Sequence, residues 1–318
     1  MTDIEIRPFR PGDRAAVVAF QNARRPPHLR ETVAEWERQD ARRPPDEVFL
    51  RLTVGDPPVA YLSAADRGTS AYRREGVCGF NLSVEEGHQR RGLSGALYAR
   101  AERFARERGL TKMATYVRLF RPDEPAVRFL ERRGFAEVDR EVPVILDLTT
   151  FDSSALARPA PEGVRLLSLA EAGDTEENRR RIWALDGALH RDIPTHAGPS
   201  EHPPFEQWVK ELDGPEFDPR AVILAENERG DWVGLSVLGF QEDTNIAWTF
   251  ITGVLPDYRG RGLAMALKLR AIGAARARAC PLITTENHED NAPMRAINRK
   301  LGFTPDAPGV SYHKSLED

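Results

Sequence analysis

A turn rich in glycine and arginine is the stretch of this sequence best suited to hold a ligand. Residues 253–264 read Gly-Val-Leu-Pro-Asp-Tyr-Arg-Gly-Arg-Gly-Leu-Ala. A β-branched and aromatic run precedes the turn and an Ala/Leu-rich run follows it, so we expect a strand, the turn and a helix in that order. Gly260 and Gly262 carry no Cβ, so backbone N–H groups can approach a ligand at the positive end of the helix. This arrangement suits a pyrophosphate, and Arg259 and Arg261 would add positive charge beside it.

Two other nucleotide-binding motifs fit this stretch poorly. A P-loop needs Lys followed by Ser or Thr, which is absent here. A dinucleotide-binding fingerprint needs a third glycine where Met265 stands, which disfavours a dinucleotide-dependent enzyme. An ordinary glycine-containing turn before a helix remains the simplest alternative if the turn is considered alone.

A second motif lies about thirty residues after the turn. Residues 291–303 read Asn-Ala-Pro-Met-Arg-Ala-Ile-Asn-Arg-Lys-Leu-Gly-Phe. Together with Arg259-x-x-Gly262-x-Ala264, this motif resembles the two signatures of the GNAT acetyltransferase superfamily, in the family's order and spacing. The resemblance implies acetyl-CoA as the acyl donor, no metal, and direct transfer of the acetyl group to a primary amine. The acceptor would be a small molecule, or else a protein or peptide N-terminus.

The resemblance also implies where the cofactor binds. The pantetheine arm would pair with free backbone at the end of the strand, and the pyrophosphate would lie on the turn. The expected cofactor-binding residues are Thr252, Gly253, Val254, Arg259, Gly260, Arg261, Gly262, Leu263, Ala264, Asn291 and Asn298.

The catalytic residues are less clear from the family pattern. The tyrosine that often serves the family as general acid would fall at Asn298, whose amide cannot release a proton. Asn298 either hydrogen-bonds the thioester or only caps backbone in its helix, and Tyr312 or Tyr258 are the alternative acids. For Tyr258, packing beside the turn is the simpler interpretation. We expect Glu286 to act as the base, because it follows a predicted strand near the mouth of the cleft, with His288 behind it.

A loop rich in proline and histidine precedes the second helix of this half of the chain. His190, His196 and His202 are six residues apart, which matches no helical face and no known ligand pattern, so we expect no metal. By position this loop would border the acceptor site, where Asp192 and Glu201 could attract a cationic acceptor.

An internal repeat accounts for the length of 318 residues. Gly92 lies 170 residues before Gly262, and Gly134-Phe135 lies 168 residues before Gly302-Phe303. The start of the chain, at residues 4–13, is also echoed at residues 164–174. Three echoes at similar offsets indicate two copies of one unit.

The repeat predicts two tandem GNAT-like domains of α/β class, each an α+β mixed and splayed sheet flanked by helices. The expected parts are an N-terminal domain at 1–150, a linker rich in proline and small residues at 151–163, and a C-terminal domain at 164–318. Strands at 142–148 and near 310–314 would close the first and the second copy.

The two copies are unequal. In the first, Ser94 stands where the family pattern has Gly or Ala, and Leu130 stands at the position corresponding to Asn298. We therefore expect a degenerate first copy and a catalytic second copy, a layout similar to tandem acetyltransferases of the mycothiol synthase type. The rival hypothesis is a non-catalytic acyl-CoA-binding sensor or scaffold protein.

Composition sets outer limits on function. The chain is 41% hydrophobic and 30% charged, with a net charge of −4, which gives no electrostatic case for nucleic acid or an anionic membrane. Cys78 and Cys280 are far apart and encode neither a disulfide framework nor a zinc site. No signal peptide or membrane-spanning run is evident, so we expect a cytoplasmic protein, and the sequence leaves a homodimer open.

Overall fold

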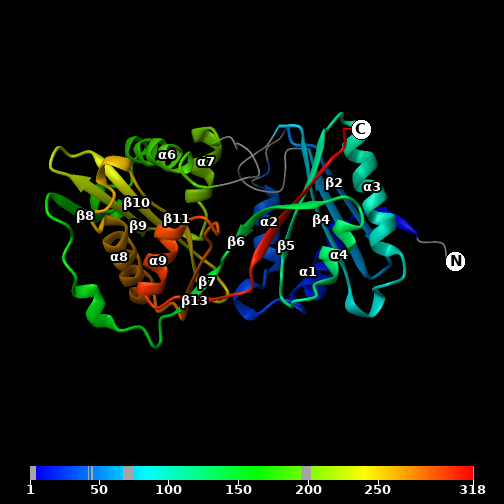
Figure 1. Ribbon diagram of the computed structural model, residues 1–318, viewed down its shortest axis with the longest axis horizontal. Coiled ribbons are helices and arrows are strands. Elements are labelled where there is room, and N and C mark those ends of the chain that lie inside the picture. Colours follow the sequence, from blue (N-terminus) through cyan, green and yellow to red (C-terminus); the bar gives the residue numbers. More distant parts are fainter. Residues whose placement is uncertain (1–4, 42, 44–45, 67–74, 195–201, 318) are drawn as a thin grey trace. The chain divides into compact units, whose positions relative to one another are not determined.

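The structure is a computed structural model that describes residues 5–41, 43, 46–66, 75–194 and 202–317. The chain forms two compact units, each built around one seven-stranded sheet (Figure 1). Unit 1 comprises Met1–Arg140, His196–Pro203 and Gly309–Asp318, and unit 2 comprises Glu141–Thr195 and Pro204–Pro308.

The sheet of unit 1 has the strand order β1-β2-β3-β4-β5-β14-β6. Its strands are β1 (Ile6–Pro8), β2 (Phe49–Val54), β3 (Ala60–Ala65), β4 (Val77–Val84), β5 (Lys112–Arg118), β14 (Gly309–Ser315) and β6 (Ala136–Glu141). Its helices are α1 (Arg14–Asn22), α2 (Val33–Ala41), α3 (Leu93–Glu107) and α4 (Pro125–Glu131). α3 buries Leu93, Leu97 and Ala101, which its helical spacing places on one face, and these residues join the main core of the unit.

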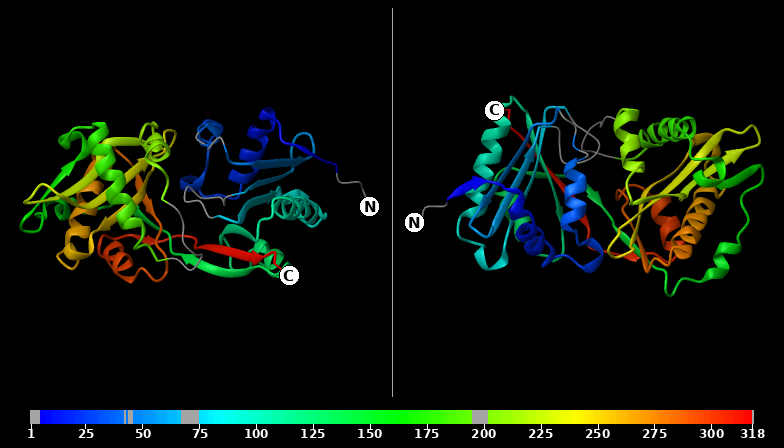
Figure 2. Two further views of the ribbon diagram at one scale, coloured as in Figure 1. Left: turned by 90° about the horizontal axis from the view of Figure 1, so that it is seen from above. Right: turned by 180° about the vertical axis from the view of Figure 1, so that it is seen from behind.

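The sheet of unit 2 has the order β13-β7-β12-β11-β10-β9-β8. Its strands are β13 (Thr304–Pro305), β7 (Val144–Asp147), β12 (Leu282–Thr285), β11 (Ala247–Val254), β10 (Trp232–Phe240), β9 (Phe217–Asn227) and β8 (Val164–Ser168). Its helices are α5 (Leu169–Ala172), α6 (Glu176–His190), α7 (Phe205–Leu212), α8 (Leu263–Ala277) and α9 (Ala292–Lys300). One core lies between the sheet and α8, and a second lies between the sheet and α6 with α7, so helices cover both faces (Figure 2).

The strands expected to close each copy are exchanged between the two units. β7 pairs with β12 in the sheet of unit 2, and β14 pairs with β5 in the sheet of unit 1. The two residues between β6 and β7, Val142 and Pro143, do not form one of the favoured hairpin turns, so the chain runs on instead of turning back beside β6. The boundaries at 150 and 164 predicted from the repeat therefore differ from the compact units.

The segment predicted as a linker also belongs to unit 2. It contains a short 3-10 helix at Ser153–Ala157, capped by the Asp152 side chain. Phe151, Ala155 and Leu156 pack against the core beside α8. The stretch is thus held on unit 2 by apolar contacts and is not an extended spacer.

Candidate functional site

The turn between β11 and α8 has the conformation that an anion-binding turn requires. Gly260 has φ 75° and Gly262 has φ 81°, both in the left-handed region that favours glycine. Gly262 is the N-cap of α8, and no side chain caps this helix end, so the first-turn N–H groups have no intrahelical acceptor. A Cβ added at Gly260 or Gly262 would meet no atom within 4 Å. The positions where these Cβ atoms would stand are open, so the turn has room on that side for an anion such as a pyrophosphate.

The sheet of unit 2 splays next to this turn. β11 and β12 run parallel but pair only at Ala247↔Ile283 and Trp248↔Thr284. β11 continues to Val254 and stays paired with β10 on its other edge. Beyond Trp248, no strand pairing within the described part of the chain joins β11 to β12. The backbone of β11 on that side is therefore available to an extended ligand such as a pantetheine arm.

A β-bulge interrupts β11 just after the splay begins. Val237 pairs with Ile251 and Leu238 pairs with Thr249, so Phe250 is the extra residue on β11. The matching strands of unit 1, β3 and β4, pair without a register shift from Ala60 to Ala65. Bulges often change the direction of side chains next to active sites. Of the two matching strand pairs, only β10–β11 of unit 2 contains a bulge.

Arg259 connects the turn to the segment after α6. Its Nε donates to the backbone oxygen of Val254 at 2.9 Å, and its Nη2 forms an ion pair with Asp192 Oδ2 at 2.5 Å. Both side chains of the ion pair are about half exposed. The sequence-based expectation that Arg259 stands beside the cofactor phosphates remains a prediction, and its guanidinium has a carboxylate partner in Asp192.

Arg261 contacts the residues that precede it in the same turn. Its Nη2 donates to the backbone oxygen of Asp257 at 2.9 Å, and its guanidinium lies 5.3 Å from the ring centroid of Tyr258. The Tyr258 hydroxyl accepts a hydrogen bond from Asn227 Nδ2. Packing and this bond therefore account for Tyr258, in keeping with the simpler of the two interpretations from the sequence.

Two of the residues that the sequence predicts to bind the cofactor, Asn291 and Asn298, belong to α9. Asn291 is the N-cap of the helix, and its Oδ1 accepts from the backbone N–H of Met294 at 3.3 Å. Asn298 is 1% exposed, and its Nδ2 donates to Asn287 Oδ1 at 2.6 Å. The Oδ1 atom of Asn298 is buried and has no hydrogen-bond partner in the described structure. Sequence reasoning did not single out Asn287, because no motif marks it.

Glu286 and His288 follow β12 but have different surroundings. Glu286 is exposed and comes directly after Thr285, the last residue of the strand. His288 is 7% exposed, forms a β-bridge with Glu141, and accepts from the backbone N–H of Asp290 through Nδ1. His288 therefore has a structural role, whereas Glu286 remains the candidate base.

Tyr312, the predicted acid of the second copy, lies in unit 1. It belongs to β14, pairs with Thr115 of β5, and is 4% exposed within the core that also holds Met113 and Tyr98. Burial raises the pKa of its phenol. Because this side chain is part of a packed core, we no longer assign it as the acid.

The corresponding turn of unit 1 keeps the same backbone path. Gln89 has φ −67° and ψ 163°, against −69° and 162° for Arg259, and Gly92 has φ 83°. Arg90, at φ 60°, occupies the place of Gly260. Ser94 therefore does not distort the turn, and the two copies differ more in the bulge and at Leu130, which is 3% exposed.

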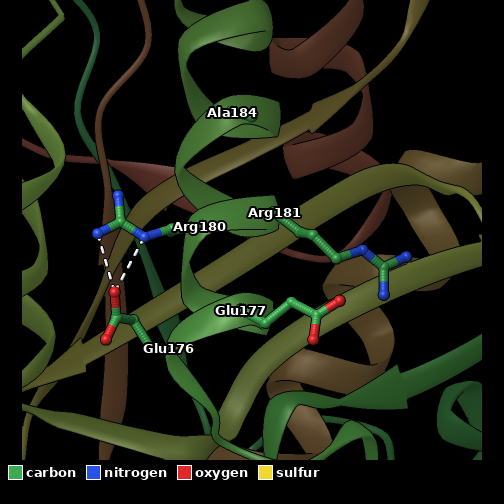
Figure 3. A pocket seen from close by; sticks show the side chains of 5 residues that line it. All are labelled: Glu176, Glu177, Arg180, Arg181 and Ala184. Atoms are coloured by element: carbon green, nitrogen blue, oxygen red, sulfur yellow. Dashed lines mark hydrogen bonds and ion pairs between the residues drawn. The ribbon is translucent and has the colours of Figure 1, made fainter.

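A hollow on α6 lies away from this site. It has a volume of about 520 Å³ and is lined by Glu176, Glu177, Arg180, Arg181 and Ala184 (Figure 3). Arg180 points to Glu176 and forms an ion pair with it at 2.8 Å. The Glu177 end of α6 is about 18 Å along the helix from Leu189, the residue that packs against Gly253 of β11.

A small cavity lies between α6, α7 and the bulge. Its volume is about 10 Å³, and Asp186, Trp208 and Phe250 are among its lining residues. Asp186 is fully buried, and its Oδ2 accepts from Trp208 Nε1 at 2.9 Å. A space of this size holds one water at most, so the cavity cannot bind a substrate.

The described residues contain no group of three or more His, Cys, Asp or Glu that could hold a metal ion. His196 and Glu201 of the loop after α6 lie outside the described residues. Within the described ranges, no helix is long and apolar enough to cross a membrane.

Curated relatives cover nearly the whole chain. A protein named mycothiol acetyltransferase from Thermobispora bispora is 28% identical over 98% of this chain and 99% of its own length. One of the same name from Geodermatophilus obscurus is 25% identical over 85% of this chain and 87% of its own.

Solved structures share the fold. A tandem GNAT protein from the clavulanic acid biosynthesis pathway matches with a TM-score of 0.78 and 22% identity, covering 99% of both chains. A GCN5-related N-acetyltransferase from Sphaerobacter thermophilus matches with a TM-score of 0.77 and 19% identity, covering 100% of this chain and 97% of that one. The sequence pattern of the acetyltransferase (GNAT) family matches residues 14–135 and again residues 185–303. The chain therefore belongs to this family as a tandem two-domain member, an acetyl-CoA-dependent N-acetyltransferase.

Proposed function

We propose that unit 2 is the catalytic unit and that it acetylates a primary amine on a small molecule. The observation that supports this most is the combination, in unit 2, of an open glycine turn, a splayed sheet edge and a bulge in the same strand. Unit 1 has the turn conformation and a splay, but its strand β4 has no bulge opposite β3. We assign unit 1 a supporting role.

The turn and the strand edge would hold the two ends of acetyl-CoA. The first-turn N–H groups of α8, from Gly262 to Ala264, would bind the pyrophosphate, and the free edge of β11 at Thr252 and Gly253 would pair with the pantetheine arm. The Thr252 hydroxyl already bonds to Ser236 Oγ at 2.8 Å, so it is the Thr252 backbone that is offered to the ligand.

The acetyl transfer itself requires little from the protein beyond holding the amine next to the thioester. The amine lone pair attacks the thioester carbonyl, the C–S bond breaks, and the CoA thiolate leaves and takes up a proton. Glu286 at the end of β12 would accept the proton that the incoming ammonium loses, through a water molecule. We assign no side chain as the acid, because Asn298 cannot release a proton and Tyr312 lies in the core of unit 1.

The curated relatives suggest where to search for the acceptor. Proteins named mycothiol acetyltransferase match most of the chain at 25–28% identity. We therefore propose a small-molecule amine, with the acceptor of those relatives as the first compound to test. The fold itself carries no information on the acceptor, because one scaffold serves many substrates.

The test is release of CoA thiol from acetyl-CoA with a panel of small amines and one short peptide. We expect turnover with at least one small amine, and none in Gly262→Glu, which puts a carboxylate where the pyrophosphate would lie. The matched control is Gly92→Glu, since Gly92 has nearly the same φ and the backbone strain is therefore similar. Turnover only with the peptide would contradict the small-molecule acceptor, and equal loss in both variants would contradict the assignment of unit 2.

A further inference from the structure

A pair of asparagine side chains links α9 to the segment that follows β12 in unit 2. Asn298 of α9 is 1% exposed and donates from Nδ2 to Asn287 Oδ1 at 2.6 Å. This bond directs the Oδ1 atom of Asn298 away from Asn287, and in the described structure that oxygen is buried without a hydrogen-bond partner. An unpaired buried acceptor costs about 1–3 kcal/mol, so its presence calls for an explanation.

The backbone explains why Asn287 is fixed. The N–H of Val142 donates to the backbone oxygen of Asn287 at 2.8 Å, and Glu141 forms a β-bridge with His288. These contacts continue the pairing of β12 with β7 on one edge. The opposite edge of β12 is the one that separates from β11 after Thr284. Asn287 is therefore anchored on one side and stands next to the splay.

An apolar residue could fill the same place. Leu130 occupies the corresponding position of unit 1, where it is 3% exposed and part of the core. A leucine at 298 would remove the unpaired acceptor, so packing does not account for an asparagine here. The Oδ1 atom of Asn298 therefore lacks a hydrogen-bond donor in the described structure, and an N–H group of a ligand that enters the splay would supply one.

We propose that Asn287 is a positioning residue that orients Asn298 so that its Oδ1 accepts an amide N–H of the pantetheine arm of acetyl-CoA. This inference rests on the proposed function, since it requires the cofactor to bind in unit 2. It gives Asn298 the role of an acceptor toward the cofactor arm instead of a partner for the leaving thiolate.

The test compares two ligands by calorimetric titration. Acetyl-CoA carries the pantetheine arm, whereas 3′-phospho-ADP has the same phosphates without it. In Asn287→Leu we expect acetyl-CoA to bind about five- to tenfold more weakly, the loss of one hydrogen bond, while 3′-phospho-ADP binds within about twofold of the wild type.

Three further variants separate positioning from general damage. Asn287→Asp keeps an acceptor oxygen facing Asn298 Nδ2, so it should restore affinity for acetyl-CoA to within about twofold. Asn298→Leu should weaken the binding of acetyl-CoA as much as Asn287→Leu does, yet this variant should unfold at the same temperature as the wild type or at a higher one. Asn178→Ala removes side-chain bonds at the start of α6, to Ala172 and Gly173, and should leave both affinities unchanged.

Several outcomes would overturn the assignment. These are unchanged acetyl-CoA affinity in Asn287→Leu, an equal loss for both ligands, a loss in Asn287→Asp as large as in Asn287→Leu, or a change confined to the KM of the amine. Failure of the wild type to bind acetyl-CoA at all would instead overturn the proposed function, and this assignment with it.

Discussion

Arg259 and Asp192 form an ion pair of 2.5 Å that joins the predicted phosphate turn to the segment after α6. The same guanidinium donates to the backbone oxygen of Val254, so it is held from two sides. The sequence suggests that Asp192 attracts a cationic acceptor, whereas the structure pairs it with the arginine predicted to stand beside the cofactor phosphates. One charge pair thus links the segment after α6, predicted to border the acceptor, to the turn predicted to hold the cofactor.

Asp192→Asn should tighten acetyl-CoA binding by about two- to fivefold, because it removes a negative charge that competes with the pyrophosphate for Arg259. The pair is half exposed, so the melting temperature should change little. Calorimetric titration measures the first effect and thermal unfolding the second. Glu176→Gln, which breaks the exposed pair with Arg180 on α6, is the matched control and should leave the affinity unchanged. Weaker binding in Asp192→Asn would contradict this account.

Lys268 of α8 is a buried lysine whose charge lowers the stability of unit 2. It is 4% exposed, its Nζ lies 5.2 Å from the ring centroid of Phe303, and burial lowers its pKa from 10.5 to about 8. Holding the lysine charged near neutral pH then costs about 3 kcal/mol at 1.36 kcal/mol per pKa unit, partly offset by the ring. We expect Lys268→Met to raise the free energy of unfolding by about 1–3 kcal/mol at pH 7.

The pH dependence gives the sign of this effect. Between pH 8 and 10.5 the unfolded lysine binds more protons than the folded one, so the stability of the wild type should rise with pH over that range. Lys268→Met should lack this rise, and the exposed substitution Lys210→Met should keep it. Urea unfolding at several pH values measures the free energy of unfolding of the wild type and of both variants. A wild type whose stability falls over this range would show that the lysine is not buried as described.

Asp40 helps to hold α2 on unit 1, as does Trp36, whose ring packs against Phe9 and Tyr61. Three arginines donate hydrogen bonds to the Asp40 carboxylate: Arg14, Arg43 and Arg51. Burial by itself raises the pKa of Asp40, but the bonds and charge of Arg51 and the bond from Arg14 outweigh it, and the pKa is lowered overall. Asp40→Asn should therefore cost about 1–3 kcal/mol at pH 7.

A lowered carboxyl pKa contributes stability above the unfolded pKa and loses it as the pH falls through the folded pKa. Wild-type unit 1 should accordingly lose stability below about pH 4, and Asp40→Asn should lose less over the same range. Asp123→Asn, at a 71% exposed side chain, is the control and should behave as the wild type. Parallel acid titrations of the variant and the wild type would contradict the role of Asp40.

Local features of the sequence predicted the repeat and the turn well. Gly260 and Gly262 have the left-handed backbone that their type suggests, and the strand, turn and helix around them form as expected. Leu93, Leu97 and Ala101 face one core, because helical spacing is a local property of the chain.

Long-range pairing is what the sequence could not reveal. Tyr312 and Leu146 lie in the short strands β14 and β7, and the local pattern of a short strand does not specify which sheet it joins. The sequence did not identify Asn287 for a similar reason. Its side chain contacts Asn298, eleven residues away, and Asn287 itself belongs to no motif. The choice of Tyr312 as an acid assumed that the last strand stays with the second copy, whereas β14 pairs with β5 in unit 1.

The most direct test of the account is calorimetric titration of acetyl-CoA into the wild type, Gly262→Glu and Gly92→Glu. The two glycines have φ 81° and 83°, so strain is nearly equal in the two variants and only the position of the new carboxylate differs. The account predicts that Gly262→Glu abolishes the binding event that supports thiol release, whereas Gly92→Glu retains it. Retention of that event in Gly262→Glu and its loss in Gly92→Glu would contradict the account and make unit 1 the cofactor-binding unit for catalysis.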